Sequence, residues 1–314
     1  MVIPLNLAQK PTPITLIDGL IEGVRIHIKR DDLTGLYASG NKVRKLEFLL
    51  ADALTSRRDM VIVAGGIQSN YVRTTLALCA KLGIKTVTLL KGKPEEPPDG
   101  NYLLDRLFAQ DFRYITEEEY ERVEEVMEDV AKEYRAKGYN PYILPRAGSN
   151  GLGAMGYVQM VEEVKDYIRE RGIDAVFLAV GSGGTYAGAL AGKMLYDIKV
   201  PFYGVLVEED PGLPEKISSI ISEISTILNK RIEVAPEDIR LILGYVGEGY
   251  GIPYPEELDI IKRLARYGII LDPVYTAKAF YGMISEKERL KFKNPLFIHT
   301  GGIFSIFSYR SYLF

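Results

Sequence analysis

The 314-residue sequence contains no tryptophan, one cysteine and two histidines, and these shortages exclude several kinds of site. A single cysteine, Cys79, rules out an internal disulfide and any metal site built from several cysteines. His27 and His299 are too few for the usual zinc sites and give no support to a Ser/His/Asp triad. Cys79 lies in the apolar stretch TTLALCAKLG, so we expect a buried, inert thiol and no metal.

Long apolar runs and basic tracts are also missing. No segment reaches the ~18 uninterrupted apolar residues of a membrane helix, and the start MVIPLNLAQKPTPI does not resemble a signal peptide. With a net charge of −3, and with Lys and Arg mixed among acidic residues, the chain has no general attraction for nucleic acid or anionic lipid. The sequence therefore predicts a cytoplasmic protein that binds neither nucleic acid nor membranes. The absence of Trp, the single Cys, few Gln and many Glu, Lys and Arg indicate a thermophilic source.

Short β-rich segments alternate along the chain with longer amphipathic ones. The segments typical of strands are 60–65, 86–92, 142–145, 175–181, 202–208 and 295–302. Helical spacing occurs at 41–54, 120–136, 156–170 and 256–268, and the acidic stretch from Glu117 to Asp129 fits a solvated helix face. This alternation predicts an α/β fold with mostly parallel, twisted sheets that helices cover on both faces.

Polar or glycine-rich turns follow two of the predicted strands, which is where open α/β sheets bind ligands. In VAGGIQSNYVR, Ser69 and Asn70 lie at a helix start, where free N–H groups can bind a carboxylate. A simple N-cap explains Ser69 at least as well. In AVGSGGTYAG, glycines and two hydroxyls can surround a phosphate, although a tight structural turn explains them nearly as well. This loop lacks the lysine of a nucleotide P-loop, and its glycines do not match the dinucleotide fingerprint.

A third segment, SGNKVRKLE, has two lysines at a predicted helix start. Lys42 and Lys45 are three residues apart, so they share one face beside the positive end of the helix dipole. Burial in such a place lowers the pKa of an amine, and a neutral amine can attack an aldehyde. Taken alone, the pair is more simply explained as two solvated lysines.

Together these segments resemble the fold type II pyridoxal-phosphate enzymes, and among them the branch of 1-aminocyclopropane-1-carboxylate (ACC) deaminases and D-cysteine desulfhydrases. The matching segments, in chain order, are KRDDLTGL, GNKVRKLE, GGIQSN, AGSNGLGAMGY, VGSGGTYAG, GEGYGIP, LDPVYTAKA and HTGG. The resemblance implies a two-lobed enzyme, with residues 46–148 as the smaller lobe and residues 1–45 and 149–314 as the larger, cofactor-binding lobe. It also implies pyridoxal 5′-phosphate between the lobes, a small amino acid as substrate, and a homodimer.

The resemblance also implies residue roles. Lys42 matches the family's Schiff-base lysine, and Lys45 matches a side chain that steadies the cofactor phosphate. That phosphate is expected in the loop formed by Ser182, Gly183, Gly184 and Thr185.

Five further residues match the family's substrate and proton-transfer positions. Ser69 matches an active-site serine, Asn70 lies beside the cofactor's phenolic oxygen, and Gln68 joins them around the substrate carboxylate. Tyr250 and Tyr275 match two active-site tyrosines, of which one stacks near the cofactor ring and either can carry a proton.

Two positions distinguish the two activities of this branch. ACC deaminases carry Glu after the tyrosine of DPVY and Leu before the final GG, whereas this chain has Thr276 and Thr300, as the D-cysteine desulfhydrases do. Two hydroxyls leave the ring nitrogen closer to neutral, which suffices when a good leaving group departs from Cβ. The resemblance therefore implies α,β-elimination from D-cysteine to pyruvate, ammonia and hydrogen sulfide, with Lys42 removing the α proton.

Other functions stay open at this point. ACC deaminase is the nearest alternative, and elimination from serine, L-cysteine or a sulfonated analogue is another, because pocket specificity depends on few contacts. A non-catalytic binder is disfavoured because Lys42, Ser69, Tyr250 and Tyr275 are all present. A nicotinamide oxidoreductase would explain the glycine loop but not the lysine pair.

Overall fold

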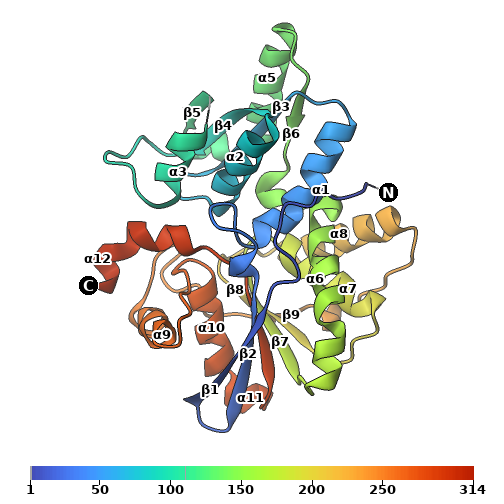
Figure 1. The fold of residues 1–314 in the computed structure, drawn as a ribbon, viewed down its shortest axis with the longest axis vertical. Coiled ribbons are helices and arrows are strands. Elements are labelled where there is room, and N and C mark those ends of the chain that lie inside the picture. Colours follow the sequence, from blue (N-terminus) through green and yellow to red (C-terminus); the bar gives the residue numbers. More distant parts are fainter. Residues whose placement is uncertain (1, 110) are drawn as a thin grey trace.

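Two separate β-sheets organise the computed structural model, which describes residues 2–109 and 111–314 (Figure 1). The larger sheet has the strand order β1-β2-β10-β7-β8-β9. Its strands are β1 (Ile14–Ile21), β2 (Val24–Arg30), β7 (Ala175–Val180), β8 (Phe202–Leu206), β9 (Arg240–Ile242) and β10 (Pro295–His299). β1 and β2 pair antiparallel, and the other neighbours pair parallel. The carboxyl ends of the parallel strands, where sheets of this kind bind ligands, therefore lie at one edge of the sheet.

The smaller sheet is parallel throughout and has the order β5-β4-β3-β6. Its strands are β3 (Met60–Gly66), β4 (Lys85–Lys91), β5 (Asp111–Ile115) and β6 (Pro141–Ile143). The predicted α/β fold with mostly parallel sheets is thus confirmed. All four strands lie within residues 46–148, and the boundaries of that lobe stay a prediction.

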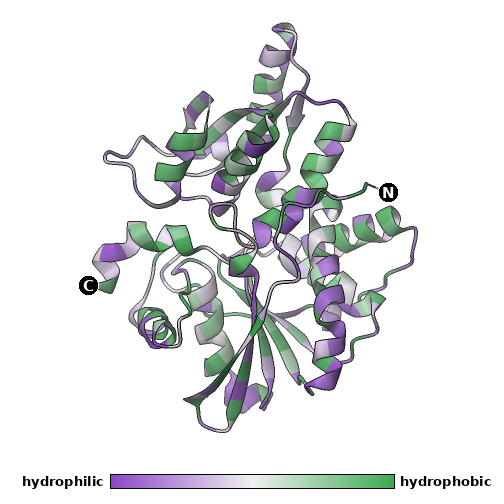
Figure 2. Ribbon diagram, viewed as in Figure 1, coloured by the Kyte–Doolittle hydropathy of each residue, from purple (hydrophilic) through white to green (hydrophobic). Residues whose placement is uncertain are grey.

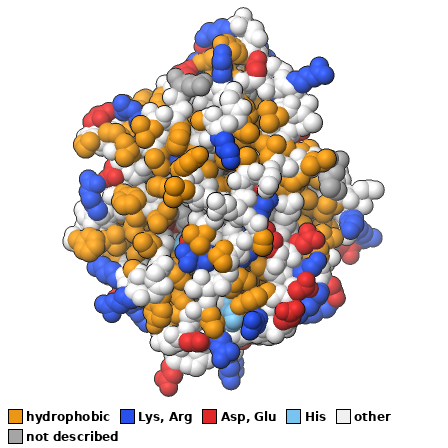
Figure 3. Space-filling view, viewed as in Figure 1, with side chains coloured by type: hydrophobic (Ala, Val, Ile, Leu, Met, Phe, Trp, Pro, Cys, Tyr) orange, Lys and Arg blue, Asp and Glu red, His pale blue; other side chains and the backbone are white. Residues whose placement is uncertain are grey.

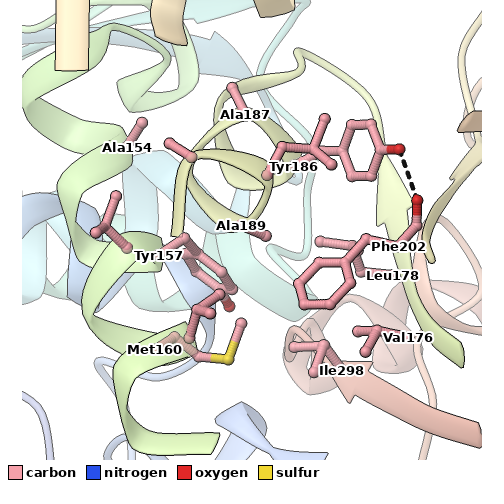
Figure 4. Close-up of a cluster of buried hydrophobic side chains, with 14 of the residues drawn as sticks. Ala154, Tyr157, Met160, Val176, Leu178, Tyr186, Ala187, Ala189, Phe202 and Ile298 are labelled. Carbon is pink, nitrogen blue, oxygen red and sulfur yellow. Dashed lines mark hydrogen bonds between the residues drawn. The ribbon is translucent and has the colours of Figure 1, made fainter. Parts of the chain in front are cut away.

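Helices cover both faces of the larger sheet. On one face lie α6 (Gly151–Glu170), α7 (Gly184–Leu195) and α8 (Leu213–Leu228), and on the other α9 (Pro255–Ala265) and α10 (Thr276–Ser285). Side chains of β7 alternate between the two layers, with Val176 and Leu178 packed towards α6 and α7 and Phe177 towards α10. Figure 4 shows the first layer, in which the Tyr186 hydroxyl donates to the Phe202 carbonyl at 2.9 Å. Figure 2 shows hydrophobic positions in green along the strands.

The smaller sheet is covered in the same way. α1 (Asn41–Thr55), α2 (Asn70–Leu82) and α3 (Gly100–Phe108) lie on one face, and α5 (Val123–Ala136) on the other, after the short α4 (Glu117–Glu121). α1 also contacts the core of the larger sheet through Phe48. The helix beginning at residue 41 is therefore packed between the two sheets, which places Lys42 and Lys45 where they meet.

Short helices complete the part of the chain that the structure describes. They are η1 (Asp31–Leu33), η2 (Arg146–Gly148), η3 (Pro236–Asp238), α11 (Lys287–Leu290), η4 (Ile303–Tyr309) and α12 (Arg310–Leu313). Within residues 2–109 and 111–314, no helix is long and apolar enough to cross a membrane.

Two expectations about side chains are confirmed. Cys79 is buried, and burial raises the pKa of its thiol to about 12, so the thiol is unreactive. In the acidic stretch, Val123 and Val130 are buried while most of the glutamates face solvent. The helix predicted over 120–136 is interrupted at Arg122, where the backbone leaves the helical region and α5 begins.

Candidate active site

The start of α1 lies against the end of β10. The Asn41 N–H donates to the Thr300 carbonyl at 2.9 Å. Gly40 has φ +89°, and a Cβ on it would come within 2.7 Å of the Thr300 oxygen. Only glycine permits this approach, so Gly40 brings the lysine-bearing helix to the edge of the larger sheet.

Lys42 is the second residue of α1, and its amine has a lowered pKa. Burial brings the pKa down to about 8, because a charged ammonium is poorly solvated there. No charged neighbour contributes to this shift among the described residues. At pH 7 about a tenth of the amine is therefore neutral, far more than for a solvated lysine, and nucleophilic attack on an aldehyde requires this neutral form.

Lys45 lies one turn further along the same face and is fully buried. Its Nζ donates to the Ala147 carbonyl at 3.2 Å and to Ser149 Oγ at 3.3 Å. Burial is the main reason that its pKa lies well below the usual range, and Lys42 lowers it further. A buried amine that contacts only neutral oxygens becomes charged most easily when an anion binds beside it, which indicates a site for an anion.

The turn between β7 and α7 supplies a cradle beside Lys45. Ser182 Oγ lies 2.7 Å from Ser149 Oγ, and Thr185 Oγ1 accepts from Asn41 Nδ2 at 2.9 Å. Gly183 has φ +85°, and a Cβ on Gly184 would come within 2.7 Å of Ser149 Oγ. The N–H groups of residues 183–185 have no acceptor in the described part of the chain. Free N–H groups at a helix start, two hydroxyls and one buried ammonium fit a phosphate dianion.

Tyr250 and Tyr275 form a hydrogen-bonded pair through their hydroxyls. Their ring centroids are 5.8 Å apart, in an edge-to-face arrangement. Tyr275 Cε1 lies 3.6 Å from the position that a Cβ on Gly181 would take, so the pair borders the phosphate cradle. Burial, together with Tyr250, raises the pKa of Tyr275 well above its usual value, so this phenol keeps its proton at neutral pH.

The turn between β3 and α2 contains the predicted carboxylate site. Ser69 Oγ accepts from the Val72 N–H at 3.2 Å, so Ser69 is an N-cap. Asn70 Oδ1 accepts from Asn101 Nδ2 at 3.0 Å, while the N–H groups of Asn70 and Tyr71 have no acceptor among the described residues. This helix start has free donors of the kind that bind a carboxylate, and the carboxylate site itself stays a prediction.

Both ends of the Gln68 side-chain amide form hydrogen bonds. Its Nε2 donates to the Asp99 carbonyl at 3.1 Å, and its Oε1 accepts from the Asn101 N–H at 2.9 Å. Gln68 therefore connects the turn between β3 and α2 to the start of α3. Its direct contact with substrate stays a prediction.

Thr276 and Thr300 differ in what their hydroxyls do. Thr276 is fully buried, and its Oγ1 donates to Asp272 Oδ1 at 2.6 Å and accepts from the Asp272 N–H at 2.8 Å. The Thr300 hydroxyl has no hydrogen-bond partner within residues 2–109 and 111–314, and its carbonyl contacts α1 next to Lys42. Of the two, only Thr300 has a hydroxyl proton that is still free to donate.

The sequence analysis missed three residues of this site, Asn41, Ser149 and Asp272. Asn41 and Ser149 connect the phosphate loop to the lysine helix, and Asp272 caps α10 by accepting from the Tyr275 N–H at 3.0 Å. Each lies in a segment quoted above, and Asn41 directly precedes Lys42. The quoted segments could have pointed to these residues. The hydrogen-bond partners of Asn41 and Ser149, however, lie far away in the sequence and become neighbours only in the folded chain.

A lysine amine with a lowered pKa beside a phosphate cradle, with proton-bearing tyrosines at its border, defines an enzyme that uses pyridoxal phosphate. The family model described as pyridoxal-phosphate dependent enzyme matches residues 5–301, and the chain belongs to this family. Its cofactor is pyridoxal phosphate.

The similar proteins carry two activities in their names. A putative 1-aminocyclopropane-1-carboxylate deaminase of Thermotoga maritima is 43% identical over 312 residues, which cover 97% of each chain. A D-cysteine desulfhydrase of Klebsiella pneumoniae is 38% identical over 321 residues, covering 98% of this chain and 97% of that protein. A solved structure of an ACC deaminase homologue has a TM-score of 0.92 and 36% identity, covering 99% of this chain and 95% of that one.

Proposed function

We propose that the protein is a D-cysteine desulfhydrase, which converts D-cysteine and water to pyruvate, ammonia and hydrogen sulfide. The observation that carries this proposal is the pair of hydroxyls at Thr276 and Thr300, where the resembling ACC deaminases have Glu and Leu. With the Thr276 proton donated to Asp272, the position after Tyr275 offers no ionised group of its own to a cofactor ring. The similarity to a protein named D-cysteine desulfhydrase supports the same activity.

The chain's own residues supply binding and proton transfer. When bound, pyridoxal phosphate supplies an electron sink for the negative charge that develops at Cα. Lys45 and the turn at 182–185 bind the phosphate, and the Asn70 and Tyr71 N–H groups with Ser69 orient the substrate carboxylate. The neutral Nζ of Lys42 accepts the α proton, because its pKa of about 8 lies near the working pH.

The tyrosine pair supplies a proton at the other end of the substrate. Burial raises the pKa of both phenols, so both are protonated at neutral pH. The half-exposed Tyr250 hydroxyl can donate its own proton to the departing sulfur, while a hydrogen bond donated by Tyr275 stabilises the phenolate that Tyr250 becomes, so that hydrogen sulfide leaves as a neutral or singly charged species.

ACC deaminase is the second candidate function, in which ACC and water give 2-oxobutanoate and ammonia. The observation that favours it is the 43% identity to a protein named as a putative ACC deaminase. Both candidate functions use the lysine, the phosphate cradle and the tyrosine pair. A measurement of which substrate is turned over is therefore needed to decide between them.

Turnover of D-cysteine and ACC, measured side by side on the purified holoenzyme, tests the proposal. L-cysteine and D-serine serve as controls for stereochemistry and for the leaving group. We expect the highest kcat/KM with D-cysteine. A higher kcat/KM with ACC would replace the proposal with the second candidate, and a cofactor spectrum without any turnover would indicate a binder.

A further inference from the structure

Lys278 is a fully buried lysine in the first turn of α10, three residues after Tyr275. Its Nζ donates to the Val246 carbonyl at 2.6 Å and to the Gly249 carbonyl at 2.9 Å. It also lies 5.7 Å from the centroid of the Tyr254 ring. Within the described residues Lys278 forms no ion pair, so two backbone carbonyls are its direct partners.

These carbonyls belong to the segment 246–251, which has no helix or strand and contains Tyr250. Gly247, Gly249 and Gly251 have φ values of +73°, +157° and +74°. Glycines in such conformations leave a segment with many alternative backbone states, so the observed one needs external contacts.

Contacts from outside fix the segment on both sides of Tyr250. Lys278 binds the carbonyls of Val246 and Gly249, which precede Tyr250. The Tyr309 hydroxyl donates to the Gly251 carbonyl at 2.7 Å, directly after it. Of these donors, Lys278 lies in the first turn of α10, which begins directly after Tyr275, so this turn connects Tyr275 to the segment that carries Tyr250.

The two carbonyl contacts of Lys278 favour a charged donor at this position. Carbonyl oxygens only accept, and an ammonium donates stronger hydrogen bonds to them than a neutral group does. Burial disfavours the charged form of Lys278 and lowers its pKa, and Glu257 and Asp272 oppose this without forming an ion pair with it. A packed apolar side chain of similar size would often be tolerated in place of such a buried ammonium. Lys278 is thus poorly explained as a packing residue.

We propose that Lys278 is a positioning residue, which fixes Tyr250 against Tyr275 through the carbonyls of Val246 and Gly249. The catalytic consequence rests on the proposed function, since it assumes that the tyrosine pair carries a proton. The structural part, that the amine at 278 orders the segment 246–251, is independent of the substrate.

The first test compares Lys278→Met with Lys262→Met, a matched change at an exposed lysine of α9. In holoenzyme with an unchanged cofactor absorbance band, we expect Lys278→Met to lower kcat about ten- to a hundredfold, up to the lower limit of a full proton-transfer contribution, because the tyrosines are displaced and not removed. KM should change little. Amide hydrogen exchange should become faster in the segment 246–252 and stay unchanged in α1 and α7. Lys262→Met should match the parent in both measurements. Unchanged kcat and unchanged exchange in Lys278→Met would overturn the proposal.

The second test separates a positioning role from a loss of packing. Lys278→Ala removes Cγ to Nζ, which n-propylammonium replaces in size and charge and 1-propanol replaces in size alone. We expect n-propylammonium, and not 1-propanol, to restore part of kcat and to slow exchange at 246–252. Equal effects of both compounds, or of neither, would contradict the proposal, and this variant also serves if Lys278→Met does not fold.

The two measurements distinguish this inference from the proposed function. If the parent enzyme releases neither pyruvate nor 2-oxobutanoate from any substrate tested, the proposed function fails. The exchange of 246–252 and its response to n-propylammonium still decide whether Lys278 orders the segment.

Discussion

At the scale of single residues, the environment of Lys42 governs how the protein acquires its cofactor. Attack on an aldehyde needs a neutral amine, and burial lowers the pKa of Lys42 from 10.5 to about 8. In cofactor-free protein the neutral fraction therefore rises with pH and is nearly complete about two units above the pKa.

We accordingly predict that the rate of pyridoxal-phosphate uptake by cofactor-free protein rises with pH, with a midpoint near 8. Stopped-flow absorbance at a series of pH values measures it. A midpoint at 10 or above would mean that the reacting amine is an ordinary solvated lysine.

Two threonines are the residues on which substrate choice is predicted to depend. Replacing them together, as Thr276→Glu with Thr300→Leu, should raise the ratio of ACC to D-cysteine turnover by about tenfold or more, the scale of a few changed pocket contacts. Thr276→Glu places a second carboxylate beside the buried Asp272, so we also expect a lower melting temperature. An unchanged ratio in a folded double variant would remove these residues from the account of specificity.

At the scale of elements, a buried charge network fixes the start of α1. Arg44 forms two hydrogen bonds with Asp31, both at 2.8 Å, and two with Glu163 on α6, at 2.7 and 2.9 Å. Asp31 also accepts from Thr12 and Tyr157. Because Arg44 is two residues after Lys42, this network sets the position of the lysine helix relative to the larger sheet.

Removing one member of the network should be costly. Asp31→Ala leaves Arg44 with a single carboxylate partner, and we expect a loss of about 3–5 kcal/mol in the free energy of unfolding. Asp18→Ala, at an exposed ion pair, should lose less than about 1 kcal/mol. Urea denaturation of both variants measures the difference, and equal losses would contradict the assigned role.

The network also gives a pH dependence with a defined sign. Burial alone would raise the pKa of Asp31, but Arg44 outweighs it and lowers the pKa below the usual value. The stabilisation is therefore complete above the ordinary aspartate pKa of about 4, and it is lost as the pH falls through the lowered value. The parent protein should lose stability more steeply than Asp31→Ala below about pH 4.

Strands with a continuous hydrophobic signal are the ones that the sequence predicts. β3, β4, β7 and β10 are buried along most of their length and were predicted from their apolar runs. β1, β2, β5 and β9 were not predicted. β5 and β9 are short edge strands with one buried residue each. Most residues of β1 are not buried, and in β2 the buried His27 and Lys29 interrupt the apolar pattern. The break at Arg122 was also missed, since helical spacing continues on both sides of it.

The same distinction applies to the site. Lys42, Lys45 and the loop at 182–185 were predicted because each lies in a recognisable segment. Lys278 lies in such a segment too, but its role depends on the carbonyls of Val246 and Gly249. Those contacts exist only in the folded chain, so sequence spacing could not reveal them.

At the scale of the whole molecule, the chain's end returns to the smaller lobe. Arg310 of α12 pairs with Asp99, and the Phe304 ring lies 4.9 Å from the Arg73 guanidinium carbon. Arg73 is buried on α2, four residues after Ser69. The C-terminal segment thus supports the predicted carboxylate site from far along the chain, and Figure 1 shows this segment next to α3.

Assembly is the second feature at this scale. Large apolar side chains of α3 and the C-terminal segment are exposed, among them Leu107 at 71% and Phe307 at 55%. Figure 3 shows hydrophobic side chains in orange over this region. Exposed apolar patches of this kind favour association, and we propose the homodimer that the family resemblance implies.

If the protein is a homodimer, its mass in solution should be near twice the chain mass of 35.2 kDa. Light scattering coupled to size-exclusion chromatography measures this mass. Leu107→Lys combined with Phe307→Lys should shift the mass towards one chain if this surface is the interface. A parent protein of single-chain mass at micromolar concentration would contradict the proposal.

The most direct test of the account is chemical trapping of the cofactor. Borohydride reduction of the holoenzyme makes the link between the cofactor and its amine permanent, and peptide mass spectrometry then locates it. We predict one modified peptide, with the modification on Lys42, and none in Lys42→Ala. Modification at another lysine, or none in a protein that shows the cofactor absorbance band, would contradict the assignment on which the proposed chemistry depends.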